Sequence, residues 1–425
     1  MAELDNRTIE RVVRRGVAEI ISEEEFVNLL KAGKPLRLKM GFDPSRPDIH
    51  LGHVVGLRKL RQLQELGHQV ILIVGDWTAQ IGDPSGQSAT RPMLTAEEVR
   101  ANAESYMRQF FKVVDRERTQ AVWQSEWFGK FGLADIIRLS SRFTVAQFLA
   151  REDFGNRFRE GRPIAITELL YPLLQAYDSV AIQADVEFGG TDQKFNLLVG
   201  RELQEMLGQR PQQCFLMPLL VGTDGVQKMS KSLGNYIAVE DPPNEMYGKV
   251  MSLPDRLIMD YFELLTDVTD EELGEFRNQL AAGTINPMVP KKRLASDIVA
   301  QFHGKPRAEE AEGYFERVFQ LGELPDEAEE VHISARRLKD LQRKVGGIEA
   351  IEDNPLVFLV KTEDLLVEVG LTQSKSEARR LLASGAVYQD GQRVASAGNG
   401  QWYINVHNGS IIRVGRRRFK RLVVE

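Results

Sequence analysis

The sequence predicts an α/β fold built on a doubly wound parallel sheet, followed by a helical portion and a small α+β portion. Two apolar runs, at residues 69–74 and 214–221, each follow a helical stretch and lead into a polar loop. Strands buried on both faces are typical of parallel sheets, in which helices cover both sides. This order occurs twice within residues 1–236, as in a sheet wound in two directions from its centre.

Length and composition fit a globular protein of several domains. With 425 residues the chain is too long for one hydrophobic core, so two to four domains are expected. The apolar fraction of 42% is that of ordinary soluble proteins. The single cysteine excludes an internal disulfide and fits a reducing compartment. No apolar run is long enough to span a membrane, and a cytoplasmic location is therefore expected.

The first half of the sheet is predicted from residues 1–86. Residues 1–33 are predicted to be helical, and the alternation of apolar and charged residues over 36–40 predicts a short strand. Residues 53–66 are predicted to form a helix and 69–74 a buried strand. The loop 75–86 then lies at the carboxyl end of that strand, where open α/β sheets bind ligands. A plain turn is the alternative, because Asp-Pro-Ser-Gly is common turn chemistry.

The loop before the first of these helices, residues 43–53, carries two histidines. His50 and His53 are three residues apart and share one face of the new helix. A helix N-terminus with free N–H groups favours an anion, so the pair predicts a phosphate site. Two alternatives remain open, namely ordinary surface histidines and a metal site. The metal site would need a third ligand, which the lone Cys214 and the other histidines do not obviously supply.

The second half of the sheet follows a helical insertion. Residues from about 95 to 165 are predicted to form this insertion between the two halves. A helix is predicted over 171–178, a strand over 180–186 and a buried strand over 214–221. The segment 187–193, with two glycines among polar residues, again precedes a helix. The second half thus resembles the first in its order of elements.

A loop with two lysines follows the last of these strands. It reads Asp224-Gly-Val-Gln-Lys228-Met-Ser-Lys231-Ser232. Lysines among small hydroxyl residues suit a mobile clamp on phosphates. A simply solvated loop is the alternative, and the loop taken alone favours it.

The remaining chain is predicted to form a helical domain over 237–346, a linker over 347–361 and a small α+β domain over 362–425. The net charge of −6 argues against a nucleic-acid partner when taken alone. Residues 413–421 are strongly basic, however, and local patches decide electrostatic recognition. A solvated charged tail is the alternative for this basic stretch.

Three stretches in this order resemble a known family. His50-Leu-Gly-His53 is similar to the HIGH signature, and Lys228-Met-Ser-Lys-Ser232 matches the KMSKS signature of class I aminoacyl-tRNA synthetases. The stretches at 82–86, 175–178 and 189–193 resemble the tyrosyl-tRNA synthetases within that class. The C-terminal portion resembles the S4-like RNA-binding module of bacterial members. The resemblance implies a Rossmann-like catalytic domain over 1–236 and a tyrosine–tRNA ligase activity.

The resemblance also implies an ATP site. His50 and His53 would bind the phosphates, Lys228 and Lys231 would hold the pyrophosphate portion, and these four would be the catalytic residues. Asp192 would accept the ribose hydroxyls. The other ATP-binding positions implied are Asp43, Ser45, Gly52, Arg91, Met229, Ser230 and Ser232. ATP would enter with Mg²⁺ as a substrate complex, and no structural metal is expected.

A tyrosine site is implied in the same way. Asp83, Tyr171 and Gln175 would take the ammonium group, and Asp178 would accept the phenol hydroxyl. A site built to hydrogen-bond a hydroxyl strongly rejects phenylalanine, because its buried polar group would stay unpaired. The full set of tyrosine-binding positions implied is Lys39, Thr78, Asp83, Tyr171, Gln175, Asp178 and Gln193.

The partners implied are tyrosine, ATP, tRNA(Tyr) and a second copy of the chain in a homodimer, with no membrane. The tRNA-binding positions expected in the C-terminal portion are Lys375, Arg379, Arg380, Arg416, Arg417 and Arg418. Charged side chains of this kind contact the phosphate backbone.

Three positions depart from the better-known branch of the family. Lys39 stands where that branch has a tyrosine that helps to read the phenol, and Glu187 stands where a glutamine is usual. Gln87 replaces a lysine, while Arg91 is kept. These departures indicate a distinct branch with the same activity.

Three other functions compete with this one. A tryptophan-specific relative would share both signatures, but Asp178 argues against it because an indole has no hydroxyl. A small-molecule nucleotidyltransferase would need no RNA-binding module. A non-catalytic RNA-binding protein would not need both histidines and the intact lysine loop. Amino-acid-dependent ATP–pyrophosphate exchange separates all of these.

Overall fold

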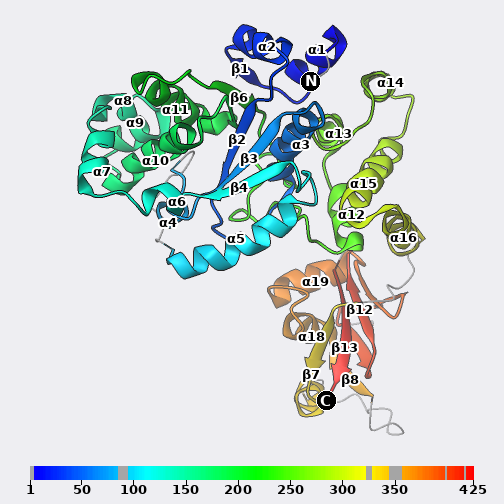
Figure 1. The fold of residues 1–425 in the computed structure, drawn as a ribbon. Coiled ribbons are helices and arrows are strands. Elements are labelled where there is room, and N and C mark those ends of the chain that lie inside the picture. The colour runs from blue at the N-terminus through cyan, green and yellow to red at the C-terminus, as the bar shows by residue number, and fades with distance from the viewer. Residues whose placement is uncertain (1–3, 85–93, 322–327, 344–356, 398–399, 416–417) are drawn as a thin grey trace. The chain divides into compact units, whose positions relative to one another are not determined.

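The computed structural model describes the chain except for residues 1–3, 85–93, 322–327, 344–356, 398–399 and 416–417. It forms two compact units, residues 1–308 and 309–425 (Figure 1). Arg91, Arg416 and Arg417, together with Gln87, lie outside the described residues. Among the helices that are described, none combines the length and the apolar character needed to cross a membrane.

The first unit is organised around a six-stranded sheet. Neighbouring strands follow the order β1-β6-β5-β2-β3-β4, and all pairs are parallel except β1 with β6. The fold class predicted from the sequence is therefore confirmed. The strands are β1 (Glu19–Ile21), β2 (Arg37–Phe42), β3 (Gln69–Val74), β4 (Thr119–Trp123), β5 (Val186–Gly190) and β6 (Gln213–Met217).

Helices cover this sheet and follow the predicted periodicity. Helix α3 (Leu51–Glu65) connects β2 to β3, and α11 (Lys194–Met206) connects β5 to β6. Both connections lie between parallel strands, which need a crossover connection that is usually a helix. The other helices between β3 and β5 are α4 (Thr78–Ile81), α5 (Ala96–Phe110), α6 (Ser125–Phe128), α7 (Leu133–Ser140), α8 (Val145–Leu149), α9 (Glu152–Arg159) and α10 (Ile166–Ile182).

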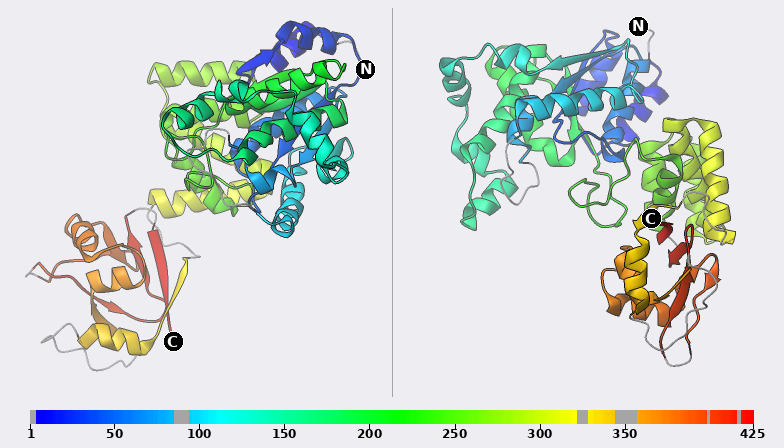
Figure 2. Two further views of the ribbon diagram at one scale, coloured as in Figure 1. Left: turned by 90° about the vertical axis from the view of Figure 1, so that its left-hand side faces the viewer. Right: turned by 90° about the horizontal axis from the view of Figure 1, so that it is seen from below.

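The two ends of the first unit add further helices. Helices α1 (Asn6–Arg14) and α2 (Glu23–Lys31) precede β2, and α12 (Pro243–Met251), α13 (Ile258–Leu265), α14 (Asp270–Ala281) and α15 (Met288–His303) follow β6. Helices α7 to α11 gather on one side of the sheet and α12 to α15 on the other (Figures 1 and 2). Arg58 on α3 bonds Asp267 at 2.5 Å, which joins the later helices to the sheet unit.

Three elements differ from the sequence prediction. The N-terminal segment contains β1, an edge strand of only three residues, too short to show a period. The predicted insertion contains β4, whose single buried residue, Val122, gives no apolar run. The segment from Val180 to Ile182, predicted to begin a strand, is the end of α10. Packing of α10 against α11 outweighs the β-branched residues there.

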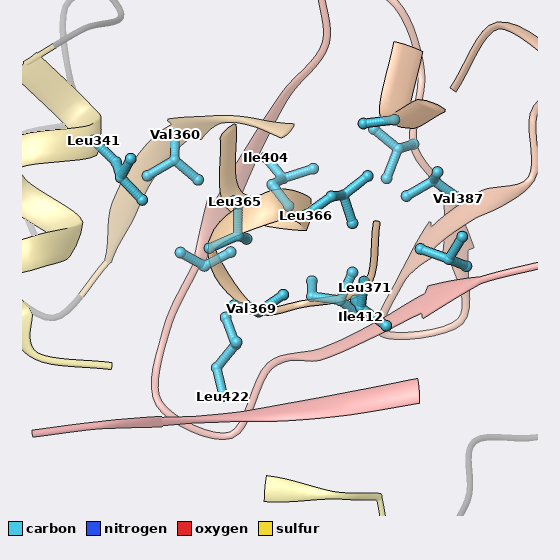
Figure 3. Close-up of a cluster of buried hydrophobic side chains, with 14 of the residues drawn as sticks. Leu341, Val360, Leu365, Leu366, Val369, Leu371, Val387, Ile404, Ile412 and Leu422 are labelled. Carbon is cyan, nitrogen blue, oxygen red and sulfur yellow. The ribbon is translucent and has the colours of Figure 1, made fainter. Parts of the chain in front are cut away.

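The second unit is a small α+β structure. Its main sheet has the order β10-β9-β12-β13-β7, and β8 pairs with β11 in a separate ladder. Val360, Leu365, Leu366, Ile412 and Leu422 are among the fully buried residues of its core (Figure 3). Its elements are β7 (Glu330–Ile333), α17 (Ala335–Arg343), β8 (Phe358–Lys361), α18 (Thr362–Glu368), α19 (Lys375–Ala383), β9 (Val387–Gln389), β10 (Gln392–Arg393), β11 (Tyr403–Val406), β12 (Ile411–Val414) and β13 (Arg418–Val424).

The limits of this unit differ from those predicted for the C-terminal domain. Strand β7, in a segment predicted to be helical, pairs in parallel with β13 from the end of the chain. Strand β8 occupies the last residues of the predicted linker. Both strands depend on partners far away in sequence, which local patterns do not reveal. Helix α16 (Lys305–Phe315) spans the division between the two units.

Candidate active site

Four polar loops meet at the carboxyl edge of the first sheet. Strands β2, β3, β4 and β5 are parallel neighbours and lead into Asp43, Thr78, Gln124 and Gln193 respectively. The Thr78 hydroxyl donates to Asp43 Oδ1 at 2.7 Å, and the Thr78 amide donates to Gln124 Oε1 at 3.0 Å. The winding direction changes between β2 and β5, and open sheets bind ligands at such a switch point.

A narrow cavity opens at this edge. Five of the seven residues predicted to bind tyrosine line it, and Asp43 does so as well. A sixth, Asp83, accepts a hydrogen bond from Gln193 Nε2 at 3.2 Å and so lies beside the cavity. The seventh, Lys39, does not line it. The lining residues are Gly41, Phe42, Asp43, Ile73, Gly75, Thr78, Gln124, Tyr171, Gln175, Asp178 and Gln193.

One side of the cavity is ordered around Asp43. Its Oδ2 accepts a hydrogen bond from the Tyr171 hydroxyl at 2.8 Å, opposite the bond from Thr78 to Oδ1. A Cβ atom at position 75 would collide with Asp43 and Thr78, so only glycine fits there. Burial and the nearby carboxylates raise the pKa of Tyr171 well above its usual value, so its hydroxyl keeps its proton.

The cavity also contains the carboxyl group of Asp178. Its two oxygens accept hydrogen bonds from Gln124 Nε2 at 2.8 Å and from Trp127 Nε1 at 3.1 Å. Burial raises the pKa of Asp178 to about 7, against the lowering effect of Lys39. Sequence reasoning missed Gln124 and Trp127, because it missed β4, the strand immediately before them.

Lys39 lies behind the cavity and has no exposed surface. Its ammonium group donates to the Gln175 carbonyl oxygen at 2.8 Å and to Ser179 Oγ at 2.7 Å. It also forms an ion pair of 2.8 Å with Glu187, which is 1% exposed. The two unexplained departures at positions 39 and 187 are thus partners of each other.

His50 and His53 lie side by side at the start of α3, with ring centroids 4.1 Å apart. His50 Nδ1 accepts from the Gly52 amide, and His53 Nδ1 accepts from the His50 amide, both at 3.2 Å. A neutral imidazole that accepts at Nδ1 carries its proton at Nε2. Burial lowers the pKa of His50 well below 6.5 and that of His53 to about 4. Both rings are therefore neutral Nε2–H donors at pH 7.

The backbone amides of this helix start are already used, contrary to the expectation of free N–H groups. The amide of Leu51 donates to the Ile237 carbonyl at 3.0 Å, and that of His53 donates to the His50 carbonyl at 2.9 Å. The Gly52 amide bonds the His50 ring. An anion would thus meet imidazole donors here. A Cβ at Gly52 would lie 2.9 Å from the His50 ring, so the glycine makes room for that ring.

The lysine loop is ordered by two polar side chains. Asp224 Oδ1 accepts from the amides of Val226 and Gln227 at 2.9 and 3.1 Å. Asn235, which is buried, accepts from the Ser230 amide at 2.8 Å and donates to Asp224 Oδ2 at 2.8 Å. No local sequence pattern marks Asn235, because its role depends on how the loop folds back.

The two lysines contact different halves of the site. Lys228 forms an ion pair of 2.8 Å with Asp192, the residue predicted to bind ribose. Lys231 donates to the Asp48 carbonyl and lies 5.3 Å from the centre of the Tyr106 ring. Burial lowers the pKa of Lys231 to about 8, so it remains mostly charged at pH 7.

The remaining ATP-binding positions lie on the same loops. Met229 is buried and its amide bonds the Leu220 carbonyl, whereas Ser230 and Ser232 share a hydroxyl hydrogen bond of 2.8 Å. The Ser45 amide donates to the Asp43 carbonyl at 2.7 Å. Within the described part of the chain, no group of three or more His, Cys, Asp or Glu residues is arranged to hold a metal ion.

The predicted tRNA-binding residues of the second unit have acidic neighbours. Lys375 pairs with Asp364 at 2.6 Å, Arg379 with Glu363 at 3.4 Å, and Arg418 with Glu377 at 3.1 Å. Arg380 is exposed on the same helix, α19. These cations lie at the surface of the unit.

Structures of known proteins share this fold. The tyrosyl-tRNA synthetase of Archaeoglobus fulgidus complexed with L-tyrosine is 25% identical, with a TM-score of 0.59, covering 73% of this chain and 100% of that one. A C-terminally truncated mitochondrial tyrosyl-tRNA synthetase of Aspergillus nidulans superposes with a TM-score of 0.62 at 20% identity, covering 73% and 94%. At that identity the second likeness concerns the fold alone.

Sequence relatives agree with these structures. The family model for class I tRNA synthetases (W and Y) matches residues 31–320. A tyrosine–tRNA ligase of Dehalococcoides mccartyi is 56% identical and covers 100% of both chains. One from Thermotoga maritima is 50% identical and covers 97% of this chain and 96% of its own. Two signature motifs on facing loops, a cavity lined by a buried carboxyl group and full-length relatives together show that the chain belongs to the class I tRNA synthetases, among the tyrosine–tRNA ligases.

Proposed function

We propose that this chain activates tyrosine with ATP and then transfers the tyrosyl group to the 3′ end of tRNA(Tyr). The observation that carries the proposal is Asp178, a buried carboxyl group fixed by Gln124 and Trp127 in a cavity that also contains Tyr171 and Gln175. A carboxylate held by two donors keeps lone pairs for a phenol hydroxyl. The tyrosine-specific relatives support the same substrate.

In the first step, the tyrosine carboxylate attacks the α-phosphorus of ATP. The bond from that phosphorus to the bridging oxygen breaks, and pyrophosphate leaves with the electron pair. The carboxylate is already a nucleophile at pH 7, so the step needs positioning and charge stabilisation. His50 and His53 would donate Nε2–H groups to the phosphates, and Lys228 and Lys231 would neutralise the departing charge.

Asp83, Tyr171 and Gln175 would hold the ammonium group of tyrosine, with Thr78 and Gln193 beside them. Asp43, Ser45 and Gly52 would lie along the nucleotide, and Arg91 is proposed from the sequence alone. We also propose that ATP enters as its Mg²⁺ complex, because Mg²⁺ favours phosphate oxygens and water over all-protein cages. The S4-like character of the second unit and the cytoplasmic location stay predictions.

Amino-acid-dependent ATP–pyrophosphate exchange tests this function. We expect exchange with tyrosine and none above background with tryptophan, because an indole offers Asp178 no hydroxyl. Exchange with tryptophan but not with tyrosine would contradict the proposal. A lack of exchange with every amino acid tested would contradict it as well.

We propose that the chain forms a homodimer through an apolar surface on helices α7 to α10. Five large apolar side chains are exposed on these four consecutive helices, and an unusual amount of exposed apolar surface is a signal of an interface. Their apolar character favours a second copy of the chain over tRNA, which is recognised through its charge. They are Leu133, Ile137, Val145, Phe158 and Ile166, of which Ile166 is 79% exposed.

Replacing Phe158 with glutamate is expected to raise the dimer dissociation constant at least about tenfold, because it buries a charge at the interface. Sedimentation at a series of protein concentrations measures this. Val289→Glu, which alters an exposed apolar side chain on α15, is the matched control and should leave the dimer unchanged. Equal sedimentation of all three proteins would contradict the proposed interface.

We propose that α19 and the basic C-terminal stretch bind the tRNA backbone. Arg380→Gln is expected to weaken tRNA binding and to lower the slope of log K against log salt by about 0.7–0.9, because one phosphate contact is lost. Binding measured at several salt concentrations gives that slope. Arg337→Gln is the control, since Arg337 pairs with Glu368 at 2.7 Å elsewhere on this unit. An unchanged slope for Arg380→Gln would remove α19 from the interface, and tyrosine exchange should not change in either variant.

A further inference from the structure

A buried ion pair lies directly behind the tyrosine cavity. Lys39 on β2 and Glu187 on β5 are register partners on adjacent parallel strands, and their side chains meet at 2.8 Å. Their exposed fractions are 0% and 1%. Burying two charges is costly unless every hydrogen-bonding position is used. The surroundings of this pair are therefore informative.

Each member of the pair has a full set of partners. Lys39 donates to the Gln175 carbonyl and to Ser179 Oγ, and its ammonium group forms the ion pair with the Glu187 carboxylate. Glu187 Oε1 also accepts from Gln175 Nε2 at 3.0 Å, and its Oε2 accepts from Ser179 Oγ at 3.1 Å and from Gln212 Nε2. So many bonds within one buried cluster restrict the positions of the groups that make them.

The network also depends on the absence of a side chain at position 200. Gly200 on α11 faces it, and a Cβ there would lie 2.7 Å from Gln212 Nε2 and 3.2 Å from Glu187 Oε2. A side chain at position 200 would therefore push the network apart.

The partners of the pair belong to the substrate-facing helix. Helix α10 carries Gln175 and Asp178, which line the cavity, and Ser179, which does not. Lys39 holds the backbone carbonyl of Gln175, while Glu187 holds its side-chain amide. Both charges thus act on the same cavity residue from behind, without touching the cavity themselves.

We propose that Lys39 and Glu187 act as one charge-paired unit that positions Gln175 and Asp178 for tyrosine, so that recognition of the substrate depends on the pair and not on either charge alone. They are positioning residues, because neither contacts the cavity. The inference rests on the proposed tyrosine activation and deepens it by naming what holds its specificity residues.

The charges also act on Asp178 in opposite directions. The groups that act on that carboxyl include Lys39 from β2, Glu187 from β5, Tyr171 from the same helix, and Gln124 and Trp127 from the segment after β4. Lys39 and the two hydrogen-bond donors favour the ionised carboxylate, whereas Glu187 and burial oppose it. Removing one member of the pair therefore changes the charge balance at the phenol site. Removing both changes it less than removing Lys39 alone, because the two opposing effects cancel in part.

The experiment is a double-mutant cycle with Lys39→Met, Glu187→Gln and the double variant. Tyrosine- and phenylalanine-dependent ATP–pyrophosphate exchange is measured for each between pH 6 and 8. We expect each single variant to raise the KM for tyrosine about tenfold or more, with little change in the KM for ATP. The pH at which tyrosine binding improves should rise in Lys39→Met and fall in Glu187→Gln. The double variant should return to within about threefold of the unmodified chain.

Lys59→Met is the matched control. Lys59 is also a buried lysine, whose ammonium bonds the carbonyls of Val12 and Arg15 at 3.1 and 2.8 Å, away from the cavity. It should lower the melting temperature without changing the KM for tyrosine or its pH profile. Glu187→Gln is close in shape to the original side chain, so one single variant remains measurable if Lys39→Met does not fold.

Two results would overturn the inference separately from the proposed function. If the effects of the single variants multiply in the double variant, the two residues act independently. If the single variants change only the melting temperature, as Lys59→Met does, the pair is merely structural. An absence of tyrosine-dependent exchange in the unmodified chain would instead overturn the proposed function, and the inference with it.

Discussion

Asp178→Asn is expected to lower the preference for tyrosine over phenylalanine by about 100-fold or more. A site that hydrogen-bonds a substrate hydroxyl discriminates against its absence by about 10⁴–10⁵. In the native site both carboxylate oxygens accept a donor, one from Gln124 and one from Trp127. An asparagine has only one oxygen, so its amide group would face one of those donors and turn the side chain away. The ratio of kcat/KM values in ATP–pyrophosphate exchange measures the loss.

Asp185→Asn is the matched control for this variant. Asp185 immediately precedes β5, at the amino-terminal ends of the parallel strands and so away from the cavity. There it accepts a hydrogen bond from the Arg37 amide at 2.8 Å. It should leave the preference for tyrosine unchanged. If Asp178→Asn retained the full preference, another group would have to read the phenol.

The same carboxyl group predicts opposite pH trends for binding and stability. Its pKa of about 7 lies above that of an unfolded aspartate, about 3.9. The folded chain therefore binds more protons than the unfolded chain between about pH 4 and 7, and stability from this group is lost as the pH rises through 7. Tyrosine binding should improve over the same rise, because the ionised form accepts the phenol O–H.

His50→Asn is expected to lower kcat by a factor of about 10²–10³, the usual effect of losing one donor to a charged transition state. Asparagine is a good N-cap residue and can still accept from the Gly52 amide, so the helix start should remain intact. What it lacks is an N–H group at the Nε2 position. Pre-steady-state measurement of adenylate formation gives the rate, and the KM for tyrosine should change little.

The pH dependence of this step tests the charge state of the histidines. Because the pKa values of His50 and His53 lie well below 6.5, neither ring gains a proton between pH 6 and 8. Neither should therefore contribute a titration to kcat in that range. A rate that rises on acidification with an apparent pKa near 6.5 would instead indicate an imidazolium donor.

Local sequence reveals those parts of the site that carry a recognisable motif or a clear apolar pattern. His50, His53 and the two loop lysines stand in recognisable motifs, and β3 is a continuous apolar run. Strand β4 has neither property, because it lies at the sheet edge and buries only one of its side chains. Missing it also hid Gln124, which the carboxyl end of that strand places in the cavity.

Pairings between distant segments could not be predicted from local sequence, for a similar reason. Lys39 and Glu187 each looked anomalous alone, and only the adjacency of β2 and β5 makes them partners. Strand β7 likewise depends on pairing with β13, some ninety residues further on. Asn235 is a third case, because its bonds to Ser230 and Asp224 exist only once the loop has folded.

The ion pair between Lys228 and Asp192 has a consequence for the order of events during catalysis. In this structure the lysine pairs with the very carboxylate that is proposed to receive the ribose. A nucleotide whose ribose takes over Asp192 would release the ammonium group beside its own phosphates. Binding of the ribose would thus free the Lys228 ammonium group to neutralise the pyrophosphate portion. Free pyrophosphate would instead encounter a lysine that is still paired with Asp192. The proposed site would in this way recognise the two ends of ATP in sequence, through one side chain that changes partner.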